Sequence, residues 1–160
     1  MANNIFIFSR PIRTGKTTEL MQWIAGKANV AGFLTPDVNE ARMLYDIRKK
    51  AYFKMQLGES DDEESISVGR FLFSRKAFNT AKSILASTAA DWLIVDEAGK
   101  LEIEQHIGLE PELSNTINSF RIGIASGNLI LVIRDTLVEK AVKKYDLGDA
   151  RIVHSLKELC

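Results

Sequence analysis

The tetrapeptide Gly15-Lys16-Thr17-Thr18 has the residue types and the order that bind a triphosphate. Triphosphate binding uses backbone N–H groups at a helix N-terminus, which donate hydrogen bonds to phosphate oxygens. A lysine at the second position can reach the β- and γ-phosphates, and a hydroxyl at the third can bind Mg²⁺. We therefore expect Lys16 to bind phosphate and assist catalysis, and Thr17 to bind the metal. Thr14, Gly15 and Thr18 complete the predicted phosphate cradle.

The loop before this tetrapeptide departs from the usual spacing Gly-x4-Gly-Lys-Thr. Arg10 stands at the first-glycine position, and no glycine occurs from Ser9 to Thr14. Glycine serves there because it accepts a positive φ and lets phosphate come close to the backbone. Arg10 and Arg13 put two cations in the loop instead. Either they bind phosphate directly, or they mark a loop that no longer wraps phosphate, or the segment is an ordinary strand–helix turn with solvated arginines.

Two carboxylates, Asp96 and Glu97, follow the apolar run Trp92–Val95. The carboxyl end of a central strand lies on the ligand-binding edge of an α/β sheet. Asp96 would hold Mg²⁺ through water, and Glu97 could polarise an attacking water as general base. Arg134 ends a later apolar run and should reach the same edge, where it could stabilise charge on a transferring phosphoryl group. A solvated Arg134, or one paired with Asp135, is the alternative.

Short apolar runs alternate with amphipathic segments along the chain. Buried strands that alternate with helices indicate a mostly parallel, doubly wound α/β sheet. We see no internal repeat or linker, so residues 1–160 are interpreted as one nucleotide-binding domain. Strands are expected at 4–8, 32–34, 71–73, 92–95, 129–133 and 152–153.

Four helices are expected between these strands. The first covers 16–28, a second is capped by Ser74, and a third has Pro111 in its first turn. The fourth opens with a capping box at 136–139 and is closed by Gly148. The residues expected to share one face of the first three helices are Met21, Ala25 and Ala28; Phe78, Ala81, Leu85 and Thr88; and Leu113, Ile117, Phe120 and Ile124.

Residues 42–56 alternate between apolar and polar side chains, which predicts an antiparallel β-hairpin inserted at about 41–57. The loop that follows, 58–65, contains the acidic run 61–64. A calcium site there is conceivable, but the run lacks the alternating ligands and central glycine of an EF-hand loop. A solvated loop is the favoured interpretation.

The composition excludes several classes of protein. The chain has 21 basic and 21 acidic residues, so no net field would draw it to nucleic acid or to an anionic membrane. Its apolar runs are too short for a membrane span, and its N-terminus lacks the features of a signal peptide. The one cysteine, Cys160, suits a reducing compartment, and we expect a cytoplasmic protein. His106 and His154 have no metal-ligand spacing, which disfavours a zinc site.

Four short motifs occur in a specific order, at 9–18, 32–38, 68–71 and 96–102. In that order they resemble the motifs of the THEP-type nucleoside-triphosphatases, also called cancer-related nucleoside-triphosphatases. The stretch 96–102 is similar to the family's Asp-Glu-Ile-Gly-Pro-Met-Glu, and 32–38 is similar to its Gly-Phe-Tyr-Thr-Pro-Glu-Val. The phosphate loop resembles Gly-Arg-Pro-Gly-Val-Gly-Lys-Thr-Thr, with one extra residue and two glycines lost. The resemblance covers nearly the whole chain.

The resemblance implies a P-loop NTPase with a RecA-like core and an added β-hairpin region. It also implies slow, Mg²⁺-dependent hydrolysis of several nucleoside triphosphates to the diphosphate. By matching position, Lys16 binds phosphate, Thr17 and Asp96 hold magnesium, and Glu97 activates water. A nucleotide-binding module without turnover is one alternative. A small nucleotide or metabolite kinase is another, which the Asp96-Glu97 pair disfavours because a base beside the magnesium aspartate suits water. No sequence feature indicates an oligomeric state.

Overall fold

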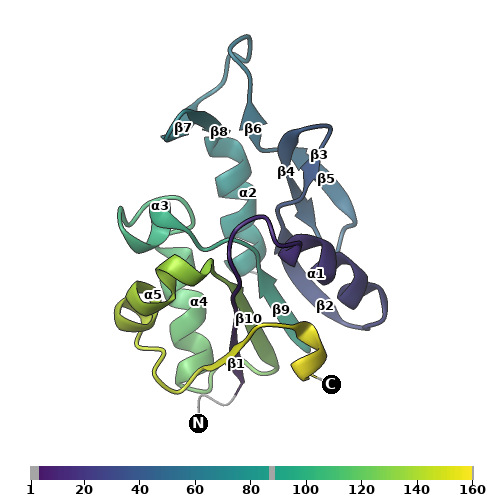
Figure 1. Ribbon diagram of the computed structural model, residues 1–160, viewed down its shortest axis with the longest axis vertical. Helices are drawn as coiled ribbons and strands as arrows, with labels where there is room; N and C mark the ends of the chain where they lie inside the picture. The colour runs from purple at the N-terminus through teal and green to yellow at the C-terminus, as the bar shows by residue number, and fades with distance from the viewer. Residues whose placement is uncertain (1–3, 87–88, 160) are drawn as a thin grey trace.

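The computed structural model describes residues 4–86 and 89–159 of the chain. A central sheet carries helices on both of its faces (Figure 1). The two layers follow from the alternation of side chains along each strand. In β1 (Ile5–Phe8), Ile5 and Ile7 join one apolar cluster, whereas Phe8 joins the other.

Parallel strands make up this sheet from its edge strand β11 inward, in the order β11-β1-β10-β9-β2. The arrangement confirms the expected mostly parallel α/β sheet. Strand β10 separates β1 from β9, yet the carboxyl ends of all three lie at one edge, so the segments after them can meet. The strands are β2 (Val30–Leu34), β9 (Trp92–Val95), β10 (Asn128–Val132) and β11 (Arg151–Val153).

Antiparallel strands extend the sheet beyond β2. Strand β4 (Ala41–Asp46) pairs with β2, with β3 (Asp37–Val38) and with β5 (Ala51–Lys54). The β4–β5 pair is the hairpin expected from the sequence. Through β4 the hairpin is hydrogen-bonded to β2, the last of the parallel strands.

A second antiparallel sheet, which the sequence did not predict, projects at the top of the molecule in Figure 1. It has the order β6-β8-β7, with β6 (Gln56–Leu57), β7 (Ser65–Val68) and β8 (Phe71–Ser74). The expected strand at 71–73 is part of it. The acidic run lies in its loop, where Asp61 pairs with Lys54 and accepts a hydrogen bond from Gly58 N at 2.7 Å. These local contacts agree with a turn rather than a calcium site.

Helix α1 (Lys16–Ala25) and the short 3₁₀ helix η2 (Leu156–Leu159) cover one face of the main sheet. The other face is covered by α2 (Arg75–Ala86), α3 (Lys100–Ile103), α4 (Glu112–Arg121) and α5 (Val138–Tyr145). None of the helices within 4–86 and 89–159 is long and apolar enough to cross a membrane.

The helix expected after Ser74 is confirmed as α2. Ala77 N donates a hydrogen bond to Ser74 Oγ at 3.1 Å, as an N-cap requires. Three of its four expected face residues are buried. The fourth, Thr88, lies outside the described residues.

Two expected helix faces need correction because the helices end early. Helix α4 stops at Arg121, and the chain turns at Gly123 with a φ of 81°, so Ile124 is 76% exposed instead of buried. Helix α1 stops at Ala25, so Ala28 lies beyond it, and both alanines are exposed. Its buried apolar residue is Leu20, which packs on the sheet.

The predicted ends of the last helix were also wrong. Thr136 lies inside the 3₁₀ helix η1 (Asp135–Leu137), so it cannot form the expected capping box with Glu139. Helix α5 starts after η1 and ends at Tyr145, and the next residue, Asp146, takes the left-handed conformation expected of Gly148. The 3₁₀ turn moves the N-cap from Thr136 to Leu137, so the helix starts one residue later than expected.

Candidate functional site

The loop between β1 and α1 curls around the side chain of Lys16. The Lys16 ammonium donates hydrogen bonds to the backbone oxygens of Arg10 at 3.0 Å and Pro11 at 2.9 Å. Arg13 and Gly15 have positive φ angles of 59° and 80°. Arg13 thus takes up a backbone conformation that glycine adopts at no cost, at a strain of about 1–2 kcal/mol. The loop keeps a wrapped form although its first glycines are missing.

Burial and the nearby carboxylates have opposite effects on the pKa of Lys16. The residue is buried, and burial lowers the pKa of its ammonium below the ordinary value, while the carboxylates of Glu97 and Asp96 partly offset that effect. Since Lys16 opens α1, its charge and the free N–H groups of the first helical turn lie together. This combination attracts an anion.

Thr17 and Asp96 meet across the site, although they are far apart in sequence. Asp96 Oδ2 accepts hydrogen bonds from Thr17 Oγ1 at 2.9 Å and from the backbone N–H of Thr35 at 3.0 Å. Asp96 is 1% exposed, and burial, assisted by the neighbouring charge of Glu97, raises its pKa to about 6. The other carboxylate oxygen, Oδ1, is buried without a hydrogen-bond partner.

The unpaired Asp96 oxygen and the Thr17 hydroxyl fit a magnesium ion. A buried polar atom without a partner is costly, and a cation would remove that cost. Mg²⁺ binds oxygen and commonly uses one or two protein ligands, with waters and substrate phosphates completing its shell. Among the described residues no group of three His, Cys, Asp or Glu side chains could hold a metal alone. Thr17 and Asp96 would therefore hold the ion together with phosphate oxygens.

Glu97 follows Asp96 and points into the same region in a strained conformation. Its φ is 60°, in the left-handed region, and its side chain is 48% exposed. The carboxylate forms an ion pair with Arg42, whose Nε donates to Asp37 Oδ1 at 3.0 Å. Backbone strain of this kind gathers at functional positions, because surrounding contacts must maintain it.

Thr35 and Arg42 are site residues that the sequence reasoning missed. Thr35 follows β2 within the 32–38 motif, so the motif itself was an available signal. Gly32 in that strand approaches β9 so closely that a Cβ would lie 2.0 Å from the Ile94 carbonyl oxygen. Arg42 had no sequence signal, since it comes from the inserted hairpin.

A cavity of about 470 Å³ at the carboxyl edge of the sheet is lined by half of the predicted site residues. Lys16 and Arg13 enter it from the phosphate loop, Asp96 and Glu97 from the end of β9, and Arg134 from the segment after β10. These groups come from separate parts of the chain but line one cavity. A phosphate bound there would lie near three cationic side chains and two carboxylates.

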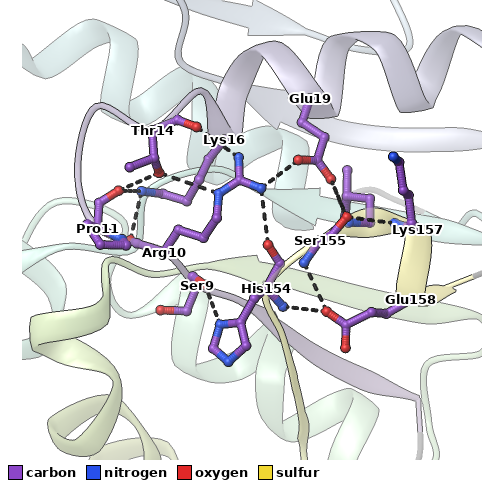
Figure 2. Close-up of polar contacts among 11 residues, drawn as sticks. Ser9, Arg10, Pro11, Thr14, Lys16, Glu19, His154, Ser155, Lys157 and Glu158 are labelled. Carbon is purple, nitrogen blue, oxygen red and sulfur yellow. Dashed lines mark hydrogen bonds and ion pairs between the residues drawn. The ribbon is translucent and has the colours of Figure 1, made fainter.

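The Arg10 side chain does not line this cavity and is turned toward Glu19 of α1 and the C-terminal segment (Figure 2). Its guanidinium donates to Glu19 Oε1 at 2.6 Å, to the backbone oxygen of His154 at 3.1 Å and to that of Thr14 at 3.0 Å. It also stacks 5.1 Å from the ring centre of Phe8. Arg10 therefore connects the loop to α1 and to the C-terminal segment.

The segment 154–159 completes this network, which the sequence did not indicate. Glu19 Oε2 accepts a hydrogen bond from Leu156 N at 2.6 Å, and Glu158 Oε2 accepts one from His154 N at 2.8 Å. His154 Nδ1 lies 2.8 Å from the backbone oxygen of Ser9. Figure 2 shows that these contacts join the loop to the end of the chain.

Comparisons with known proteins agree with this geometry. A family model described as NTPase matches residues 4–153. The crystal structure of THEP1 from the hyperthermophile Aquifex aeolicus has a similar fold, with a TM-score of 0.69. The two chains are 17% identical, and the match covers 94% of this chain and 88% of that one. No curated protein sequence gives a significant match. The similarity to THEP1 confirms the predicted P-loop NTPase fold.

Proposed function

Because the chain belongs to the NTPase family, we propose that it hydrolyses nucleoside triphosphates to the diphosphate and phosphate with the help of Mg²⁺. One observation carries the proposal: the Thr17 hydroxyl, next to the phosphate loop, donates a hydrogen bond to Asp96 Oδ2 at 2.9 Å. Lys16 and Glu97 line the same cavity. A hydroxyl, a carboxylate, an ammonium and a base are the groups that this reaction uses.

Substrate binding would depend on the N-terminus of α1 and on Lys16. The backbone N–H groups of the exposed residues Gly15 and Thr18 would donate to the α- and β-phosphates, and the Lys16 ammonium would contact the β- and γ-phosphates. Bound Mg²⁺ neutralises charge on the β- and γ-phosphate oxygens. Asp96 and Thr17 would orient that ion from the floor of the site.

Glu97 is the proposed general base. Its carboxylate would accept a proton from the attacking water, and its ion pair with Arg42 would hold the side chain in position. Arg13 and Arg134 line the same cavity and would stabilise charge on the phosphoryl group. Arg10 would not contact the substrate and would position the loop through its hydrogen bonds with Glu19 and Thr14.

The substitution Glu97→Gln tests the proposal. It keeps the shape of the side chain and removes the base, so phosphate release from Mg-ATP and Mg-GTP should fall by about 10²–10⁴-fold. Binding of both nucleotides, measured by calorimetry, should persist. Glu40→Gln is the matched control, since Glu40 is another carboxylate on the cavity wall. Equal phosphate release by wild type and Glu97→Gln would contradict the assignment of the base.

A nucleotide-binding module without turnover is the second candidate. The observation in its favour is Arg13. It has the positive φ that glycine adopts easily, so its backbone is strained, and it adds a charge to the loop. The wild-type protein decides between the two candidates. Saturable binding of Mg-ATP with no phosphate release above the Glu97→Gln level would establish the module.

A further inference from the structure

The cavity beside Glu97 continues into an apolar chamber. Its walls there come from the second antiparallel sheet and from α2, and they include Phe71, Phe73 and Phe78. Phe71 remains 40% exposed, and its ring centre lies 6.4 Å from that of Phe73. The total volume of about 470 Å³ falls in the range of sites that bind small organic molecules. One attacking water does not need an aromatic chamber of this kind.

The position of the phosphate loop indicates which part of a substrate could reach this chamber. Lys16, which would contact the β- and γ-phosphates, lines the cavity. Thr14, Gly15 and Thr18, which would cradle the α- and β-phosphates, are exposed and do not line it. The α-phosphate and the nucleoside would therefore lie outside. The chamber is on the γ-phosphate side, where the attacking group arrives.

The charges on the cavity wall favour an uncharged occupant. The cationic side chains Arg13, Lys16, Arg42, Lys100 and Arg134 are matched by the carboxylates of Asp37, Glu40, Asp96, Glu97 and Glu102. A bound triphosphate would make the balance negative. A second anion would then be repelled, whereas a neutral aromatic molecule could pack on the phenylalanine rings.

We propose, on the basis of the triphosphatase function above, that this chamber binds a small neutral aromatic alcohol that accepts the γ-phosphoryl group. The alcohol would place its ring against Phe71 and Phe73 and its hydroxyl near Glu97. Its oxygen forms a bond to the γ-phosphorus, and the bond from that phosphorus to the β,γ-bridging oxygen breaks. The nucleoside diphosphate leaves, and the alcohol proton passes to Glu97. Water is the acceptor when the chamber is empty.

The test uses 2-(2-naphthyl)ethanol, a fluorescent neutral alcohol, with the full chain. Binding is followed by its fluorescence, first without nucleotide and then with saturating Mg-ADP. Reaction with Mg-ATP is followed by ³¹P NMR, which separates a naphthylethyl phosphate from inorganic phosphate. Phe71→Ala removes a ring from the chamber. Leu72→Ala is the matched control, because Leu72 is the next residue of β8, is also exposed and does not line the cavity.

We expect the probe to bind with and without Mg-ADP, and its phosphate ester to appear beside inorganic phosphate. Phe71→Ala should weaken probe binding about tenfold, the cost of one lost aromatic contact, and Leu72→Ala should leave it unchanged. Displacement of the probe by Mg-ADP would place the nucleoside in the chamber and overturn the proposal. Absence of probe binding would also overturn it.

Two further outcomes separate this proposal from the proposed function. Simultaneous binding with phosphate as the sole product would overturn the transfer step. Probe binding without nucleotide, in a protein that does not bind Mg-ATP, would overturn the triphosphatase function and with it the acceptor role.

Discussion

The two sides of the phosphate loop use their charges differently. On one side, the Arg10 guanidinium donates hydrogen bonds to Glu19, Thr14 and His154. On the other side, Asp96 keeps a buried carboxylate oxygen without a partner, and the Glu97 side chain is half exposed. A charged side chain that is hydrogen-bonded within the protein, as Arg10 is, stabilises the structure. A buried carboxylate oxygen without a hydrogen-bond partner, as in Asp96, is suited to bind a ligand.

The same contrast separates the two arginines of the loop. Arg13 is exposed, has a positive φ and lines the cavity, so it is placed to meet phosphate. Arg10 lines no part of the cavity and anchors the segment 154–159. The sequence alone did not distinguish the two arginines, and the same alternatives stood for both. We therefore propose phosphate contact for Arg13 and loop positioning for Arg10.

Lys16→Ala should give the largest change in nucleotide affinity. Loss of a charge-assisted hydrogen bond to phosphate costs about 1.5–3 kcal/mol, or roughly tenfold to a hundredfold in Kd. Calorimetric titration with Mg-ATP measures it. Lys49→Ala removes an exposed lysine far from the loop and should bind like wild type. If Arg10→Ala weakens affinity as much as Lys16→Ala, the contrast between the two sides of the loop is wrong.

Asp96 should make the stability of the ligand-free protein fall as the pH rises. Its folded pKa of about 6 lies above the ordinary 3.8, so protonation favours the folded state. That contribution is complete below about pH 4 and is lost as the pH rises through about 6. The shift corresponds to roughly 2–3 kcal/mol. Asp96→Asn, compared with wild type by urea unfolding, should gain relative stability between pH 5 and 8. A constant difference would mean that Asp96 is ionised at pH 5.

The Arg10–Glu19 pair should contribute mainly to stability. Both side chains are about a quarter exposed, so we expect a coupling energy of about 1 kcal/mol in a double-mutant cycle of unfolding. The exposed pair Arg121–Asp146 is the comparison and should couple more weakly. Hydrogen exchange at 154–159 should increase in Arg10→Ala. Unchanged exchange there would show that Arg10 does not anchor the C-terminal segment.

Arg13→Gly should have the smallest effect, and a favourable one. Relief of the left-handed strain should exceed the added entropy of the unfolded chain, for a gain of about 0.5–1 kcal/mol in unfolding free energy. Arg13→Ala removes the same charge but keeps the strain, so it isolates the backbone effect. Thermal and urea unfolding of both variants give the answer. Lower stability of Arg13→Gly would mean that the side chain itself supports the loop.

The sequence by itself determined the local features of this protein. Continuous apolar runs marked the main strands, and Gly15-Lys16-Thr17-Thr18 marked the start of α1. The pair Asp96-Glu97 marked the end of β9. These signals lie within a few consecutive residues, where side-chain period and helix start signals act. Helix ends were less predictable, because turns such as the one at Gly123 override propensity.

Only the tertiary structure decided which distant groups share the site. Arg42 meets Glu97 across 55 residues of sequence, and Glu19 holds Leu156 across 137. The second antiparallel sheet likewise joins strands whose own sequences are short and weakly patterned. Such contacts follow from strand order and packing, which no local pattern encodes. Folding therefore turned Arg10 away from the cavity and left one Asp96 carboxylate oxygen buried without a hydrogen-bond partner.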